Sequence, residues 1–386
     1  MAVDLEGNRR AVAGVAPYRR ALASGSGRLF AMGRGALLHG LQLLGCGPGD
    51  SLLLPEYICR DASDPLLDAG YEVRYYGVDQ GLRIDLSSLD ALIDSSTRAA
   101  LVVDYFGFPQ TLDGIARFCR DRGLYLIEDN AHGFLSADRG APLGFRGDIG
   151  IVSIRKTLSL RDGAILLVNS AELRKRGPMD PGIPRVSWGS AFRWGLAIAG
   201  KVVARRLPRA LPTLQRGAQL LGSTGSRLPP PSAIPVPPDA KATASLGPIS
   251  GESWFEIAHT DAMKIILRRR ANYLRLLDWL QGDRRVHIIF PELVEGICPY
   301  VFPILVDDGS RTIEEFRRRG IAADYWPDLP PSVSVSPDLY PSAAALRSRL
   351  VTLPVGQDVR VRARAEEKGS RGPRNLAERL SIAYRP

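Results

Sequence analysis

The feature that most constrains the fold is a regular alternation between residues 28 and 170. Short apolar runs alternate there with amphipathic, helix-like segments. Strands buried on both faces of a sheet read as nearly continuous apolar runs, and their alternation with helices is typical of βαβ crossover units. We expect strands at 51–54, 72–76, 99–103, 124–127, 149–154 and 164–168, and helices at 36–44, after Pro55 and at 112–121. The sequence thus predicts an α/β protein with a mostly parallel central sheet flanked by helices.

The glycine cluster at 45–49 resembles a dinucleotide-binding fingerprint. However, the cluster follows an expected helix and precedes an expected strand. The dinucleotide-binding motif requires the opposite order, a strand before the glycines and a helix after them. We interpret the cluster as a turn.

The rest of the chain changes in character. We divide the sequence into an N-terminal arm (1–27), a large domain (28–174), an Arg/Pro-rich insertion or linker (175–250), a smaller α+β domain (251–360) and a basic tail (361–386). The smaller domain is expected to hold one long helix over 252–280, a strand over 300–306 and a helix from Thr312 to Gly320. The tail beyond Val359 is polar and expected to be partly disordered. Within the insertion, Phe192–Leu211 reads as a basic amphipathic helix that packs on its own protein or a partner subunit; contact with a membrane surface is the less favoured alternative.

Composition narrows the function further. The formal net charge is +10, which favours anionic partners. The arginine runs 268–270 and 317–319 lack the interleaved aromatics of a nucleic-acid site, and we expect both to be exposed helix faces. The cysteines form no C-x-x-C pair and the histidines no H-x-x-x-H pair, so we expect neither a disulfide framework nor a metal centre. The N-terminus reads as having no signal peptide, and a cytoplasmic location is expected.

Two strand ends carry residues suited to chemistry. The apolar run 124–127 ends in Glu128 and Asp129, at the edge where open α/β sheets bind ligands. The run 149–154 delivers Ser153 and Lys156 to the same edge. Alone, an acid there often caps a helix, and a lysine after a strand is usually exposed. Their combination, with His132 close by, indicates a site.

These segments resemble the DegT/DnrJ/EryC1/StrS family of PLP-dependent, nucleotide-sugar aminotransferases, over about residues 28–170 and 252–358. Four motifs in the first half of the chain carry the resemblance: Gly35-Ala36-Leu37, Gly47-Pro48-Gly49-Asp50, Asp104-Tyr105-Phe106-Gly107-Phe108-Pro109-Gln110 and Glu128-Asp129-Asn130-Ala131-His132. A fifth is the block from Gly147-Asp148 to Asp162-Gly163, which contains Ser153 and Lys156. The last two are Trp326-Pro327 and Leu353-Pro354-Val355. Three departures stand out: Asp104 replaces the usual histidine, Ala164 replaces a glycine, and the loop between Ser153 and Lys156 is two residues shorter.

The resemblance implies fold type I and pyridoxal 5′-phosphate (PLP) as cofactor. Lys156 would hold PLP covalently as a Schiff base and later move the proton, Asp129 would pair with the protonated ring nitrogen, and His132 would hydrogen-bond the phenolic oxygen. Ser153 and the backbone amides of Gly35 and Ala36 would bind the phosphate. The aromatic residue that stacks on the ring in relatives would fall near Tyr57 or Cys59.

The implied activity is transfer of an amino group, from glutamate in our reading, to a keto-sugar carried on a nucleotide, by a homodimer. Two alternatives stay open: a PLP enzyme of the same fold with a non-sugar substrate or altered chemistry, and a non-catalytic PLP-binding regulator. The sugar dehydratase branch is disfavoured, because it replaces the Schiff-base lysine with histidine and Lys156 is present here. Retention of Asp129, His132 and Lys156 together argues against the regulator.

Overall fold

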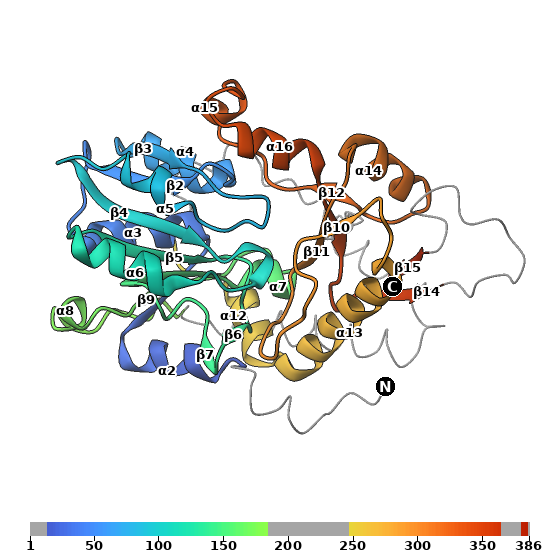
Figure 1. Ribbon diagram of the computed structural model, residues 1–386. Helices are drawn as coiled ribbons and strands as arrows, with labels where there is room; N and C mark the ends of the chain where they lie inside the picture. The colour runs from blue at the N-terminus through green and yellow to red at the C-terminus, as the bar shows by residue number, and fades with distance from the viewer. Residues whose placement is uncertain (1–13, 184–246, 364–379, 385–386) are drawn as a thin grey trace, which may run out of the picture.

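The computed structural model describes residues 14–183, 247–363 and 380–384. Its N-terminal part is built around a seven-stranded sheet and its C-terminal part around a four-stranded sheet, and the two lie side by side (Figure 1). The helix expected over 192–211 lies outside the described residues. Among the helices that are described, none combines the length and the apolar character needed to cross a membrane.

The large sheet has the order β1-β9-β8-β5-β4-β2-β3. Five neighbouring strands, from β8 to β3, run parallel, whereas β9 is antiparallel to both β8 and β1. The prediction of a mostly parallel sheet is therefore confirmed. The strands are β1 (Gly27–Phe30), β2 (Ser51–Pro55), β3 (Glu72–Tyr76), β4 (Thr97–Val103), β5 (Tyr125–Asn130), β8 (Ile149–Ser153) and β9 (Ala164–Val168).

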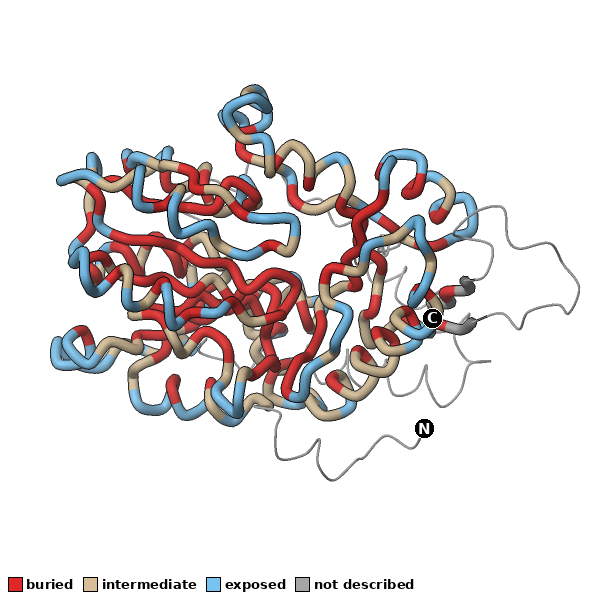
Figure 2. The backbone as a smooth tube through the Cα atoms, in the orientation of Figure 1, coloured by how far each residue is buried: buried red, intermediate tan, exposed pale blue. Residues whose placement is uncertain are grey.

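Helices cover both faces of this sheet. The crossover from β2 to β3 runs in one direction along the sheet and that from β4 to β5 in the other, so right-handed connections place their helices on opposite faces. The strands between them are mostly buried (Figure 2), and every residue of the strands at 51–55, 149–153 and 164–168 is buried. The helical elements of this part are α2 (Ala16–Ser24), α3 (Gly33–Leu44), α4 (Arg60–Asp68), α5 (Leu86–Asp90), η1 (Tyr105–Gly107), α6 (Leu112–Asp121), α7 (Ile154–Leu158) and α8 (Ala171–Arg174), and a small ribbon pairs β6 (Ala137–Asp138) with β7 (Ala141–Pro142).

The small sheet has the order β10-β11-β13-β12 and all its described pairs are antiparallel. Its strands are β10 (His287–Ile288), β11 (Val301–Leu305), β12 (Asp324–Tyr325) and β13 (Leu350–Pro354). The helices around it are α12 (Gly251–Ala258), α13 (Ala262–Leu280), α14 (Gly309–Arg318), α15 (Pro331–Ser334) and α16 (Pro341–Arg349).

The single helix expected over 252–280 is wrong. The chain breaks between α12 and α13, where the Asp261 side chain accepts a hydrogen bond from the Lys264 amide and caps the second helix. An aspartate that can cap a new helix competes with continuing the old one, because its side chain bonds the backbone better at a helix start than in its interior.

The described residues at the two ends of the tail beyond Val359 form strands. Residues of β14 (Val359–Ala363) pair antiparallel with β15 (Leu380–Tyr384). The buried side chain of Asn272, on α13, donates to the carbonyl oxygens of Val355, Gly356 and Val359 and so anchors the start of this hairpin.

Candidate active site

The parallel strands of the large sheet end at a pocket of about 750 Å³, part of which is open to solvent. Asp129 of β5 and Ser153 of β8 line it, as does Lys156 in the short helix that follows β8. The N-terminus of α3 contributes Gly33 and Arg34. Trp326, from the C-terminal part of the chain, completes the wall, so both parts of the molecule build the pocket.

His132 is fixed from several sides. Its ring stacks on Phe106 (centroids 5.7 Å apart, planes at 8°) and on Tyr300 (4.9 Å, 2°), and the edge of Trp326 lies against it at 4.9 Å. The Phe106 amide donates a hydrogen bond to Nδ1 of His132 at 3.3 Å. Because Nδ1 is an acceptor, the proton of the neutral ring resides on Nε2.

The Nε2 atom of His132 lies 3.3 Å from Nζ of Lys156. Burial, reinforced by the neighbouring lysine charge, holds the pKa of His132 well below its usual range. The imidazole is therefore neutral, and its Nε2 atom faces the lysine amine.

Only one oxygen of the Asp129 carboxylate is hydrogen-bonded within the described part of the chain. One oxygen accepts the Ala131 amide at 2.9 Å, and the other has no hydrogen-bond partner among the described residues. Burial raises the pKa of Asp129, while the charge of Lys156 and the Ala131 amide act in the opposite direction. Such a group is suited to a cationic donor supplied by a ligand.

The backbone beside Lys156 is held by the C-terminal part of the chain. Arg269 of α13 donates to the Thr157 carbonyl oxygen at 2.9 Å, and Gln357 donates to the same oxygen at 3.0 Å. The same guanidinium donates to the carbonyl oxygen of Tyr300, whose ring stacks on His132. The expectation that Arg269 lies on an exposed face is wrong: it is 3% exposed, because three carbonyls and the Gln357 side chain satisfy it.

The phosphate-binding amides assigned to Gly35 and Ala36 need correction. Both amides donate to the Met32 carbonyl within the first turn of α3, and neither residue lines the pocket. The free amides of this helix start belong to Gly33 and Arg34, which do line it. The helix begins earlier than the sequence indicates, because its N-cap is Met32, which offers no side-chain hydrogen bond.

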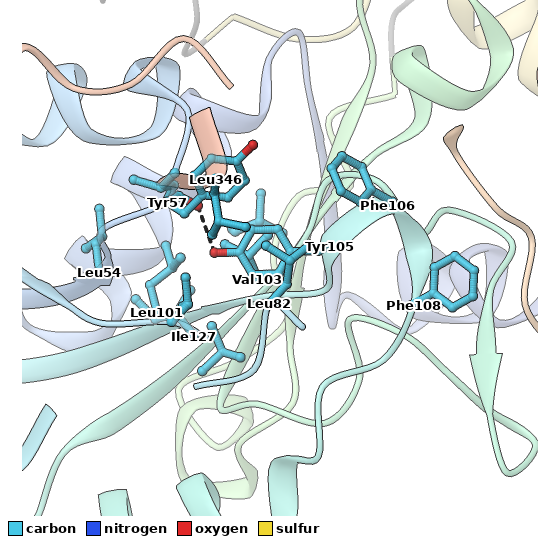
Figure 3. Close-up of a cluster of buried hydrophobic side chains, with 14 of the residues drawn as sticks. Leu54, Tyr57, Leu82, Leu101, Val103, Tyr105, Phe106, Phe108, Ile127 and Leu346 are labelled. Carbon is cyan, nitrogen blue, oxygen red and sulfur yellow. Dashed lines mark hydrogen bonds between the residues drawn. The ribbon is translucent and has the colours of Figure 1, made fainter. Parts of the chain in front are cut away.

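Of the two candidates for stacking on a ligand ring, only Cys59 lines the pocket. Tyr57 is fully buried; its hydroxyl donates to the Trp326 carbonyl and its own carbonyl accepts the Tyr105 hydroxyl. Figure 3 shows Tyr57 among core side chains, beside Tyr105 and Leu346. Burial raises the pKa of the Cys59 thiol, so this residue offers the pocket a small, neutral surface.

Behind the pocket, Asp104 and Glu128 share Arg146. The guanidinium lies 2.8 Å from Asp104 and 2.7 Å from Glu128, and both acids are 0% exposed. Burial and the facing Glu128 carboxylate raise the pKa of Asp104 well above its usual range, against the effect of Arg146. The environment therefore favours the neutral form of Asp104 more than an ordinary site would.

A model of the DegT/DnrJ/EryC1/StrS aminotransferase family matches residues 25–179, the stretch that carries Asp129, His132 and Lys156. This segment belongs to that family. A DegT-family relative, the dTDP-4-dehydro-2,3,6-trideoxy-D-glucose 4-aminotransferase of Saccharopolyspora spinosa, is 33% identical over 147 residues, 37% of this chain and 38% of its own length. The UDP-N-acetyl-3-dehydro-alpha-D-glucosamine 3-aminotransferase of Acidithiobacillus ferrooxidans is 29% identical over 150 residues, 38% of this chain and 41% of its own. The match therefore spans about two fifths of these curated relatives.

The likeness in structure extends further along the chain. The aminotransferase TlmJ of Streptoalloteichus hindustanus superposes with a TM-score of 0.60, covering 89% of this chain and 84% of its own at 21% identity. The fold is fold type I, as the family resemblance predicts.

Several residues at the pocket were not assigned from the sequence. Arg34 and Arg155 line it, and the ring of Tyr300 stacks on His132. Trp326 was noted only as part of a family motif. Arg155 lies next to Lys156 and could have been found from that position; Tyr300 lies far along the chain, in a strand start with no distinguishing pattern.

Proposed function

We propose that this protein is a PLP-dependent aminotransferase that moves an amino group from an amino-acid donor, glutamate in our reading, to a keto-sugar carried on a nucleotide. The observation that carries the proposal is the His132–Lys156 pair, 3.3 Å apart beside Asp129 in one pocket. The family of residues 25–179 supports the activity, and a solved protein of this fold is in a PLP form. The two relatives above act, by their names, on dTDP- and UDP-linked keto-sugars.

The chemistry of the pocket fits this cofactor. The unpaired oxygen of Asp129 would accept a protonated ring nitrogen, and the Nε2–H of His132 would donate to a phenolic oxygen. The hydroxyl of Ser153 has no hydrogen-bond partner among the described residues and, with the free amides at the start of α3, would bind a phosphate. When bound, PLP would supply the electron sink that makes the proton on the substrate carbon acidic.

Each of three residues would then have its own role in the reaction. Lys156 would hold the cofactor and, once its amine is free, carry a proton between two carbon atoms. The carboxylate of Asp129 would keep the ring nitrogen protonated. His132, fixed between Phe106 and Tyr300, would keep its N–H directed at the oxygen beside the lysine.

We further propose that residues 28–174 and 251–360 act as large and small domains of one subunit, and that two subunits form a homodimer with the site at their interface. The support is the family alone. Sedimentation of the purified protein at several concentrations tests the dimer; a monomer that binds PLP fully would refute it.

An absorption spectrum tests the activity itself. The purified protein should carry a visible PLP band that borohydride removes, that Lys156→Ala lacks, and that glutamate shifts to the pyridoxamine form. A nucleotide-linked keto-sugar should restore the band. If PLP binds but no amino donor shifts the band, the regulator alternative is favoured; if donors work but only a non-sugar ketone restores it, the altered-substrate alternative is.

A further inference from the structure

The lining of the pocket includes two arginines whose charges are poorly neutralised. Arg34 and Arg155 both line it. The side chain of Arg34 is 14% exposed, and its acidic neighbour among the described residues is Asp61, 3.9 Å away and 61% exposed. At that distance, and with the carboxylate of Asp61 exposed to solvent, the pair contributes little. The guanidinium of Arg155 makes no hydrogen bond or ion pair within the described part of the chain.

The two arginines start from neighbouring backbone. The Gly163 amide donates to the Ala31 carbonyl at 2.8 Å, and the Gly163 carbonyl accepts the Arg155 amide at 3.1 Å. Gly163 therefore joins the loop before α3, which leads directly to Arg34, to the start of α7. The positive φ of Gly163, 127°, is one that other residues rarely adopt.

Neutral donors line the same pocket. Ser153 is 3% exposed, lines the pocket and has no hydrogen-bond partner for its hydroxyl among the described residues. The free amides of Gly33 and Arg34 face the pocket at the positive end of the α3 dipole. The Ser153 hydroxyl is therefore available to a ligand in this pocket.

We infer that the guanidinium groups of Arg34 and Arg155 bind the phosphate of the cofactor as a dianion, together with Ser153 and the amides of α3. This inference rests on the proposed function and adds two charged residues to it. Two guanidinium groups balance the two charges of the phosphate, and their planar, forked donors match its oxygens. The protein should therefore bind PLP far more tightly than pyridoxal, which lacks the phosphate.

The test is a set of binding titrations on the full-length, cofactor-free protein, followed by visible absorbance. PLP and pyridoxal are titrated into the wild type, Arg34→Gln, Arg155→Gln and the control Arg161→Gln, whose side chain is exposed on the same segment. Each arginine variant should weaken PLP binding about tenfold or more, as the loss of a charge-assisted hydrogen bond implies. Pyridoxal binding should not change, and the control should match the wild type for both ligands.

Two further measurements sharpen the result. Inorganic phosphate should compete with PLP for the wild type and compete several-fold less well for the arginine variants. Arg34→Lys, which keeps the charge, should recover part of the PLP affinity, and melting curves show that each variant is folded.

Unchanged PLP affinity in both glutamine variants would overturn the inference and assign the arginines to a substrate anion instead. Equal losses for PLP and pyridoxal would also overturn it, because the effect would not act through the phosphate. A wild type that binds neither ligand would refute the proposed function itself, and that outcome is seen before any variant is compared.

Discussion

The Nε2 atom of His132 faces Nζ of Lys156 at 3.3 Å, while Nδ1 of the same ring accepts the Phe106 amide. The amide thus decides which nitrogen carries the proton, and burial keeps the ring neutral. The donor is set before any ligand arrives, since both restraints come from the fold.

His132 should make stability fall in acid. Its pKa in the folded protein lies well below that of the unfolded chain, about 6.5. The unfolded state therefore binds the proton first, and folding loses up to ~1.4 kcal/mol per pH unit as the pH falls below about 6.5. Urea unfolding of the cofactor-free wild type and His132→Gln at pH 7.5, 6.5 and 5.5 should show a smaller pH slope in the variant. Equal slopes would show that His132 does not titrate in this way.

Asp129→Asn should lower the activity and raise the stability of the cofactor-free protein. Burial raises the pKa of Asp129, so its charge is costly in the empty pocket, and the neutral amide should raise the free energy of unfolding of the cofactor-free protein at pH 7. The half-reaction with glutamate should slow by about a hundredfold or more, because the ring nitrogen loses its charged partner. The exposed Asp113→Asn should alter neither quantity. Normal half-reaction rates in Asp129→Asn would mean that another acid holds the ring nitrogen.

Arg146→Gln should be among the most destabilising single changes behind the pocket. It leaves Asp104 and Glu128 buried without a cation, and breaking a buried ion pair in this way costs about 3–5 kcal/mol. Asp104→Asn should cost much less, since burial and Glu128 already favour the neutral form of Asp104. Denaturant unfolding of both variants measures the contrast. Similar losses would show that the charge on Asp104 matters.

Arg269→Met should slow the capture of PLP by Lys156, because the Thr157 carbonyl loses one of the two donors that fix the lysine segment. The matched control is Arg270→Met on the same helix, where the side chain bonds the carbonyls of Leu293, Val294 and Ile297 instead. Both variants should lose stability, but only Arg269→Met should slow the appearance of the visible band. If both slow it equally, Arg269 is only a structural link.

Most of the large sheet could be predicted because each strand is a compact apolar run. The bounds expected for β3, β9 and α6 agree with the structure. The break between α12 and α13 was missed because both flanking segments have the same helical pattern, and only the capping role of Asp261 separates them.

In the candidate site, too, some residues could be predicted from local sequence and others could not. Asp129, His132, Ser153 and Lys156 lie at or just after strand ends that are close in sequence, so local pattern and family resemblance singled them out. Arg269 looks like its two arginine neighbours in the sequence, and only tertiary packing shows that it is buried. The register error at Gly35 and Ala36 arose because Met32, unlike serine or aspartate, gives no sign of a helix start.

The double hydrogen bond to the Thr157 carbonyl also imposes an order on assembly. Its donors, Arg269 and Gln357, are encoded 112 and 200 residues after the acceptor. During synthesis the strands of the large sheet emerge first. The segment with Lys156 can gain its first donor only after residue 269 has been translated, and its second only after residue 357. A product that stops short of residue 357 would therefore carry the reactive lysine on a backbone held by one donor at most.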